Sequence, residues 1–139
     1  MILLDTNVVS AVMPPRPPRA VLGWLDIQPR GGLYLPSIAI AEIRYGLHIL
    51  PDGRRRQDLE ARFERFVARG FARRVLPFDE AAANLYGELM ARRRSLGRPM
   101  SSLDGQIAAI ARAHQLAVAT RNVPDFEDCG LEVVDPFEG

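Results

Sequence analysis

Short apolar runs alternate along the chain with longer segments in which apolar residues recur at helical spacing. The apolar runs, typical of buried strands, cover residues 2–4, 33–35, 75–76, 116–119 and 131–134. The segments of helical period run from Val8 to before Pro14 and over residues 19–27, 38–50, 54–68, 80–96 and 103–114. This alternation predicts an α/β fold of three layers, α/β/α, around a central, mainly parallel five-stranded sheet. We expect residues 1–139 to form a single domain.

Residues that start or interrupt helices support these boundaries. We expect the Thr6-Asn7 pair to cap the first helix and Ser37 the third, Asp79 to cap the helix over residues 80–96, and Ser101 or Ser102 to open the helix over 103–114. The run Pro14-Pro15-Arg16-Pro17-Pro18 cannot be helical and predicts a stiff, extended connection.

The first apolar run stops at Asp5, which places a carboxylate at the carboxyl end of a buried strand. Ligands of open α/β sheets collect in the crevice beyond these strand ends, so Asp5 is the first candidate for chemistry. The alternative is that Asp5 only caps the helix that follows it.

A second acid, Glu42, lies in the second turn of a segment that is apolar on nearly every side. A helix of this composition is expected to be largely buried, and Glu42 shares its face with Ile38 and Gly46. A buried carboxylate without a partner is costly. Glu42 therefore pairs with Arg44 or another arginine, or it binds a cation.

A third acid, Asp104, falls in the first turn of its helix and faces the core. Ile107, Ala108 and Ala111 follow it at the spacing of one helix face. The helix N-terminus partly explains an aspartate there, although a position facing solvent would satisfy that interaction equally well.

Asn122 and Asp125 follow the fourth strand, so these polar residues are expected at the same edge of the sheet as Asp5. Converging carboxylates repel each other and must be protonated or neutralised by a cation. Oxygen ligands without cysteine or histidine partners favour Mg²⁺ or Mn²⁺. Such a site suits the hydrolysis of a phosphodiester.

Composition narrows the possible functions. All 18 basic residues are arginine, which excludes mechanisms that require lysine, among them Walker phosphate loops and phospho-aspartate receivers. The formal charge of +1 does not by itself indicate nucleic-acid binding. The single cysteine, Cys129, cannot form an intramolecular disulfide. Without an apolar segment of membrane-spanning length or a signal peptide, a cytoplasmic protein is expected.

Four segments resemble the motifs of the PIN-domain nucleases, and more closely those of the VapC (FitB-like) toxins of type II toxin-antitoxin systems. They are LLDTNVVS at residues 3–10, AEIRYG at 41–46, SSLDGQIAAIA at 101–111 and VATRNVPDF at 118–126. They follow the family order and cover essentially the whole chain. The resemblance implies a PIN-like fold and a Mg²⁺-dependent endoribonuclease.

The same resemblance implies roles for individual residues. Asp5, Glu42 and Asp104 would hold the metal, and Thr6 would orient the first acid or the attacking water. The fourth motif has Asn122 where many relatives have aspartate, so either Asp125 supplies the missing carboxylate or the site uses a neutral ligand. Candidates for gripping RNA phosphates are Arg16, Arg19, Arg54 to Arg56 and Arg121.

The resemblance also implies a VapB-type antitoxin whose C-terminal segment lies across the acidic groove. Members of this family typically form homodimers, and their complexes bind operator DNA through the antitoxin. The alternative is a catalytically degenerate PIN-like module that binds RNA or antitoxin without cutting.

Overall fold

The centre of the molecule is a five-stranded sheet, seen in a computed structural model that describes residues 1–138. Its strands are β1 (Ile2–Leu4), β2 (Leu33–Pro36), β3 (Val75–Leu76), β4 (Ala117–Ala119) and β5 (Val133–Val134). Their order is β3-β2-β1-β4-β5, and every neighbouring pair is parallel. The predicted sheet is therefore confirmed, and its first strand lies in the middle.

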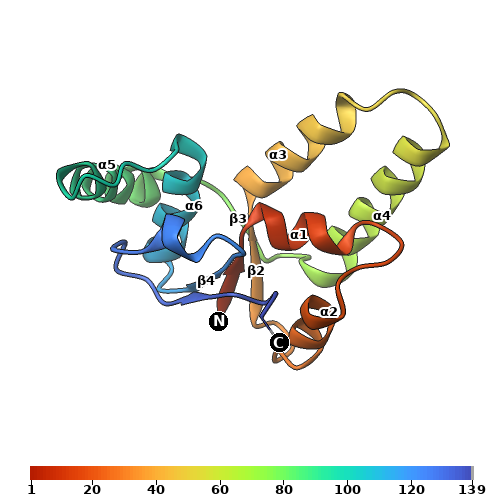
Figure 1. Ribbon diagram of the computed structural model, residues 1–139, viewed down its shortest axis with the longest axis horizontal. Coiled ribbons are helices and arrows are strands. Elements are labelled where there is room, and N and C mark those ends of the chain that lie inside the picture. Colours follow the sequence, from red (N-terminus) through yellow and green to blue (C-terminus); the bar gives the residue numbers. More distant parts are fainter. Residues whose placement is uncertain (139) are drawn as a thin grey trace.

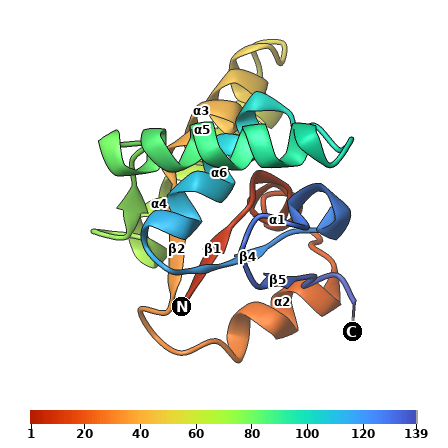
Figure 2. The same ribbon diagram turned by 90° about the vertical axis from the view of Figure 1, so that its left-hand side faces the viewer.

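Helices cover both faces of this sheet (Figure 1 and Figure 2). They are α1 (Thr6–Val12), α2 (Arg19–Asp26), α3 (Ser37–His48), α4 (Arg54–Gly70), α5 (Glu80–Ser95) and α6 (Ser102–Ala113), followed by a short 3-10 helix at Val123–Phe126. Side chains alternate across a strand, so the adjacent Leu3 and Leu4 enter different cores. The Leu3 core contains α5 and α6, and the Leu4 core contains α1 to α4. The three-layer prediction is confirmed.

Two predicted helix caps are wrong. Helix α1 begins at Thr6, and Asp5 is its cap, with the Asp5 carboxylate accepting a hydrogen bond from the Thr6 backbone N–H. Ser37 lies inside α3, which begins directly after Pro36 without a side-chain cap. Asp79 and Ser101 cap α5 and α6 as predicted.

Helix α3 is less buried than its composition predicts. Tyr45 is 70% exposed and Ile49 is 66% exposed. The reason is that α3 and α4 form an arm that projects beyond the sheet (Figure 1), so only one side of α3 reaches the core, through residues such as Ile43 and Leu47. Within residues 1–138, no helix is long and apolar enough to cross a membrane.

Candidate active site

Asp5 lies at the carboxyl end of the central strand and is 5% exposed. Its backbone N–H donates to the Ala119 carbonyl at 2.9 Å, which continues the pairing of β1 with β4. One carboxylate oxygen accepts from the Thr6 N–H at 2.8 Å, and the other accepts from the Thr120 hydroxyl at 2.8 Å. Asp5 is thus a helix cap and also an inward acid at the expected edge of the sheet.

Burial raises the pKa of Asp5 from 3.8 to about 6. The hydrogen bonds from Thr120 and Thr6 oppose this shift, whereas the negative charges of Asp104 and Glu42 add to it. The ionised form of Asp5 is therefore held in an environment that favours a neutralising positive charge.

Glu42 accepts a hydrogen bond from the Thr6 hydroxyl at 2.8 Å. The expected alternative partner, Arg44, pairs instead with Glu64 at 3.7 Å, so that reading is wrong. Thr6 contacts both acids: its backbone N–H holds Asp5, and its hydroxyl holds Glu42. Thr6 thus lies between Asp5, its neighbour in the chain, and Glu42, which is 36 residues further along the sequence.

Asp104 is half-buried in the first turn of α6, where the Ser101 cap accepts from its N–H at 3.2 Å. Burial raises the pKa of Asp104; the hydrogen bond with Ser101 lowers it, and the charges of Asp125 and Glu42 raise it further. Asp104 therefore shares an electrostatic environment with acids from α3 and from the 3-10 helix.

These acids line one open pocket of about 620 Å³. Its walls are Asp5, Thr6, Asn7, Ser10, Ala11, Pro14, Arg16, Pro18, Glu42, Asp104, Arg121 and Asn122. The pocket thus collects seven of the predicted site residues, namely Asp5, Thr6, Arg16, Glu42, Asp104, Arg121 and Asn122. Arg19 and Arg54 to Arg56 lie outside its walls. Asp125 also lies outside them and is exposed, although its charge acts on Asp104.

The donor set of the pocket suits a hard divalent cation. The side chains of Asp5, Glu42 and Asp104 present carboxylate oxygens, which Mg²⁺ prefers, and burial together with the charge of nearby acids raises the pKa of Asp5 and of Asp104. Among the residues that the structure describes, no three or more acidic, histidine or cysteine side chains are grouped closely enough to hold a metal ion by themselves. Magnesium commonly retains several waters, so a few carboxylates around an open pocket fit it.

Two further residues support Asp5 and were not predicted as site residues from the sequence: Thr120 contacts Asp5, and Asn7 contacts Thr120. Thr120 is fully buried, and its hydroxyl, which donates to Asp5, accepts from the Asn7 amide at 3.2 Å and from the Asn122 N–H at 3.0 Å. The register that pairs Leu4 with Ala119 brings the following residues, 5 and 120, side by side. The sequence pattern that could have identified Thr120 is a polar residue directly after each of two adjacent strands.

Arg93 belongs to the run of three arginines that ends α5, where a positive charge interacts favourably with the helix dipole, and the structure buries it. Arg93 is only 4% exposed, and its guanidinium group donates to the carbonyls of Arg98, Asp125 and Glu127 at 2.7, 3.1 and 2.6 Å. Arg98 adds ion pairs to Glu127 and Asp128 at 3.0 Å each. These two arginines fix the 3-10 helix that carries Asp125 beside Asp104.

The predicted RNA-binding arginines lie in different surroundings. Arg121 lines the pocket, and its guanidinium stands 3.9 Å from the centre of the Phe137 ring. Arg16 also lines the pocket, in the loop after α1, whereas Arg19 is exposed at the start of α2. Arg56 is engaged by Asp52 at 2.9 Å and Glu60 at 2.8 Å, so it is a structural residue of α4.

Comparison with known proteins assigns this chain to a family. The profile of the PIN domain matches residues 2–128, and the chain therefore belongs to the PIN-domain family. Within that family its relatives are toxins of the VapC and FitB group. It is 46% identical over 138 residues to VapC ribonuclease Y4jK of Sinorhizobium fredii, with 99% of each chain covered. It is 39% identical over 137 residues to toxin FitB of Neisseria gonorrhoeae, again with 99% of each chain covered.

A solved structure of FitAB bound to a DNA fragment contains a similar chain. That chain superimposes with a TM-score of 0.93 at 37% identity, covering 100% of the present chain and 97% of its own length. The PIN-like α/β fold implied by the sequence motifs is therefore confirmed.

Proposed function

We propose that the protein is a Mg²⁺-dependent endoribonuclease toxin of a type II, VapBC-like toxin-antitoxin module that hydrolyses RNA phosphodiester bonds. The observation that carries this proposal is the position of Asp5, Glu42 and Asp104 in the walls of one open pocket of about 620 Å³. The raised pKa of Asp5 supports it, because a bound cation would relieve the repulsion that contributes to that shift. The matched PIN domain supports the same class of chemistry.

Asp5, Glu42 and Asp104 would hold the metal, which would be Mg²⁺ with Mn²⁺ as a possible substitute. When bound, the ion polarises a phosphate oxygen and lowers the pKa of a coordinated water. The protein's own part is to orient the acids. Thr6 and Thr120 fix the two oxygens of Asp5, so that its carboxylate has a single orientation toward the pocket.

The fourth position of the site is proposed to be Asn122, a neutral wall residue, with Asp125 acting on Asp104 from outside the pocket. Arg16 and Arg121 in the wall would bind the phosphates that flank the scissile bond, and Arg19 would lie further along the RNA. Arginine suits this task because its planar guanidinium binds phosphate through two parallel hydrogen bonds.

The proposal includes partners. A cognate VapB-like antitoxin would cover the acidic pocket and suppress the nuclease, and operator DNA would be reached only through that antitoxin. The similar FitAB complex bound to DNA supports this arrangement. We further propose a homodimer, a cytoplasmic location and a single domain over residues 1–139.

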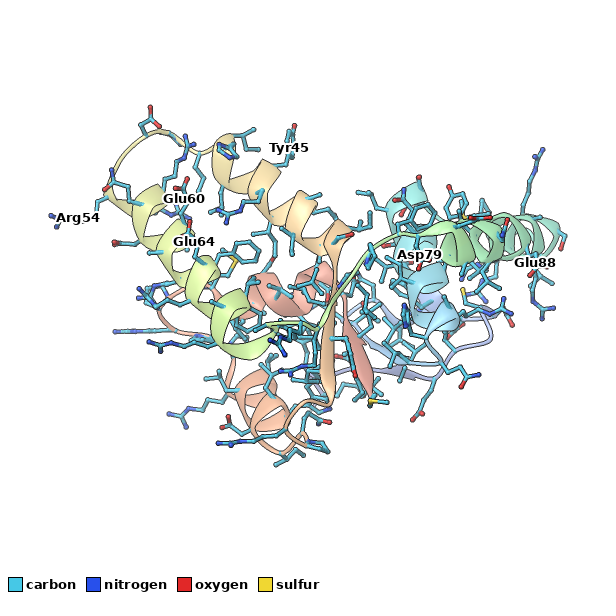
Figure 3. All side chains as sticks on the ribbon, turned by 180° about the vertical axis from the view of Figure 1, so that it is seen from behind. Tyr45, Arg54, Glu60, Glu64, Asp79 and Glu88 are labelled. Atoms are coloured by element: carbon cyan, nitrogen blue, oxygen red, sulfur yellow. The ribbon has the colours of Figure 1, made fainter. Side chains whose placement is uncertain are left out.

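The test is cleavage of total RNA by the purified protein, with Mg²⁺ and with EDTA. Cleavage should require the metal and should fall by at least about 100-fold in Asp5→Asn and Asp104→Asn, because each change removes a charge-bearing ligand. The matched control is Glu88→Gln on α5, an exposed acid remote from the pocket (Figure 3). Equal cleavage by all four proteins would reject the metal-nuclease function.

The second candidate function is a catalytically degenerate module that binds RNA or antitoxin. The observation in its favour is Asn122, which replaces an acid in the pocket wall. It predicts RNA binding without cleavage under any divalent metal. Cleavage that responds to Asp5→Asn would exclude it.

A further inference from the structure

A second hollow adjoins the acidic pocket. It has a volume of about 410 Å³ and is lined by Pro14, Pro15, Arg54, Arg55, Asp58, Leu59 and Arg62. Pro14 is also a wall of the acidic pocket, so the two hollows share a boundary. The second hollow lies where the loop after α1 meets the first half of α4.

A third hollow, of about 460 Å³, continues this row along α4. Its walls include Arg62, which it shares with the second hollow, and also Arg65 and Arg69. Residues 62, 65 and 69 follow each other at the spacing of one helix face. A row of arginines, Arg54, Arg55, Arg62, Arg65 and Arg69, therefore leads away from the acidic pocket. We call it the arginine track.

The arginine track carries uncompensated positive charge. Among the described residues 1–138, none of its arginines forms a salt bridge, although Asp58 is present in the second hollow. Arg56, inside the same run of three arginines, is held by Asp52 and Glu60 instead. Arg56 is therefore a structural residue of α4, whereas its neighbours Arg54 and Arg55 line the second hollow.

RNA needs positive charge outside the acidic pocket. The pocket walls contain three carboxylates against two guanidinium groups, so their formal charge is −1 without a metal and only +1 with one divalent ion bound, which attracts a long polyanion weakly. Proteins that hold single-stranded nucleic acid combine a basic groove that follows the backbone with side chains, commonly aromatic, that contact the bases. The second hollow supplies the basic groove, and Pro14, Pro15 and Leu59 supply apolar, non-aromatic surface beside it.

We propose that the arginine track binds the single-stranded RNA that extends from the scissile phosphate, with its phosphates on the arginines and a base against Pro14, Pro15 and Leu59. This inference rests on the proposed nuclease function. It adds a substrate-binding surface on α4, outside the pocket in which cleavage occurs.

The test replaces Arg54, Arg55 and Arg62 together by glutamine in an Asp5→Asn background, which prevents cleavage during the measurement. The probe is a fluorescein-labelled oligouridylate of twelve nucleotides, followed by fluorescence anisotropy from about 50 to about 200 mM salt. Affinity should fall at least tenfold at the lower salt concentration. The slope of log affinity against log salt should decrease by about 2, because each phosphate contact with a single strand contributes about 0.7.

Two controls accompany this variant. Arg94→Gln, in the same background, removes an exposed arginine from α5 on the other side of the sheet and should leave both affinity and slope unchanged. The triple replacement by lysine keeps the charges and should retain most of the salt dependence. It also keeps the proposal testable if the glutamine variant fails to match the thermal unfolding midpoint of its parent.

The proposal is overturned if the glutamine variant binds the oligonucleotide as tightly, and with the same slope, as the Arg94→Gln protein. It is equally overturned if RNA binding persists while binding to a polyglutamate peptide is lost, because the track would then belong to an acidic protein partner. Failure of the nuclease function is a separate result. The protein with Asp5 intact would then cleave no RNA, whatever the triple variant binds.

Discussion

Replacing the buried acid of the pocket should stabilise the metal-free fold at neutral pH. Asp5 has a pKa of about 6 in the folded protein and an ordinary value of 3.8. Between these two values the folded state holds more protons than the unfolded state, so the free energy of unfolding decreases as pH rises through this window and stays lower above it. The change Asp5→Asn removes this pH-dependent contribution to the free energy of unfolding.

The structure sets the size of the effect. The rise in the pKa of Asp5 from 3.8 to about 6 lowers the free energy of unfolding by about 3 kcal/mol above pH 6. Asn can still accept from the Thr6 N–H, but its other side presents an amide to Thr120, whose hydroxyl loses its acceptor. That loss costs about 1 kcal/mol. The variant should therefore be more stable than the parent by about 2 kcal/mol near pH 7.5 and less stable by about 1 kcal/mol near pH 3.5.

Urea unfolding in EDTA at both pH values measures this difference. A reversal of sign between them is expected, and a difference that is the same at both would refute the assignment of a raised pKa to Asp5. Adding Mg²⁺ near pH 7.5 should increase the free energy of unfolding of the parent, because a ligand that binds only the folded state stabilises it, and should have little effect on the variant.

Three other changes probe the supports of the site. Arg93→Met removes a side-chain donor from three backbone carbonyls, of which only that of Glu127 also accepts from the Cys129 thiol, and should lower the free energy of unfolding by about 3 kcal/mol, measured in urea. Arg94→Met, on the exposed side of α5, should change it little, and equal losses would contradict the role of Arg93. Thr120→Val removes a hydrogen bond that lowers the pKa of Asp5, so the acidic limb of the pH-rate profile should move to higher pH; an unmoved limb would argue against this coupling. Asp79→Ala removes the cap of α5 and should cost about 1 kcal/mol of stability without altering that profile.

Much of the sheet and most helix boundaries could be predicted because they depend on local patterns. An apolar run bounded by polar or proline residues identified β1 and β2, and the spacing of apolar residues identified α4 and α5 to within a few residues. The start of α1 was less certain, since Asp5, Thr6 and Asn7 are all good capping residues. The hydrogen bond from the Asp5 N–H to the Ala119 carbonyl keeps Asp5 in the extended backbone of the sheet, so the helix begins at Thr6.

The contacts that complete the site were beyond local reasoning. The partner of Glu42 is Thr6, a residue of another motif, and only the packing of α1 against α3 reveals it. Three consecutive arginines end α5, and no periodicity shows that the middle one, Arg93, turns inward to hold a distant loop. Whether a charged side chain is buried depends on the segments, distant in the sequence, that pack over it.

The middle position of β1 also bears on how such proteins can diverge. Asp5 is anchored to the strand with neighbours on both sides, so moving its carboxylate means disturbing the whole sheet. The proline loop and α4, by contrast, lie at the periphery and can change sequence without touching that strand. Sequence changes at this periphery can therefore alter what the protein binds while the strand that carries Asp5 stays constant.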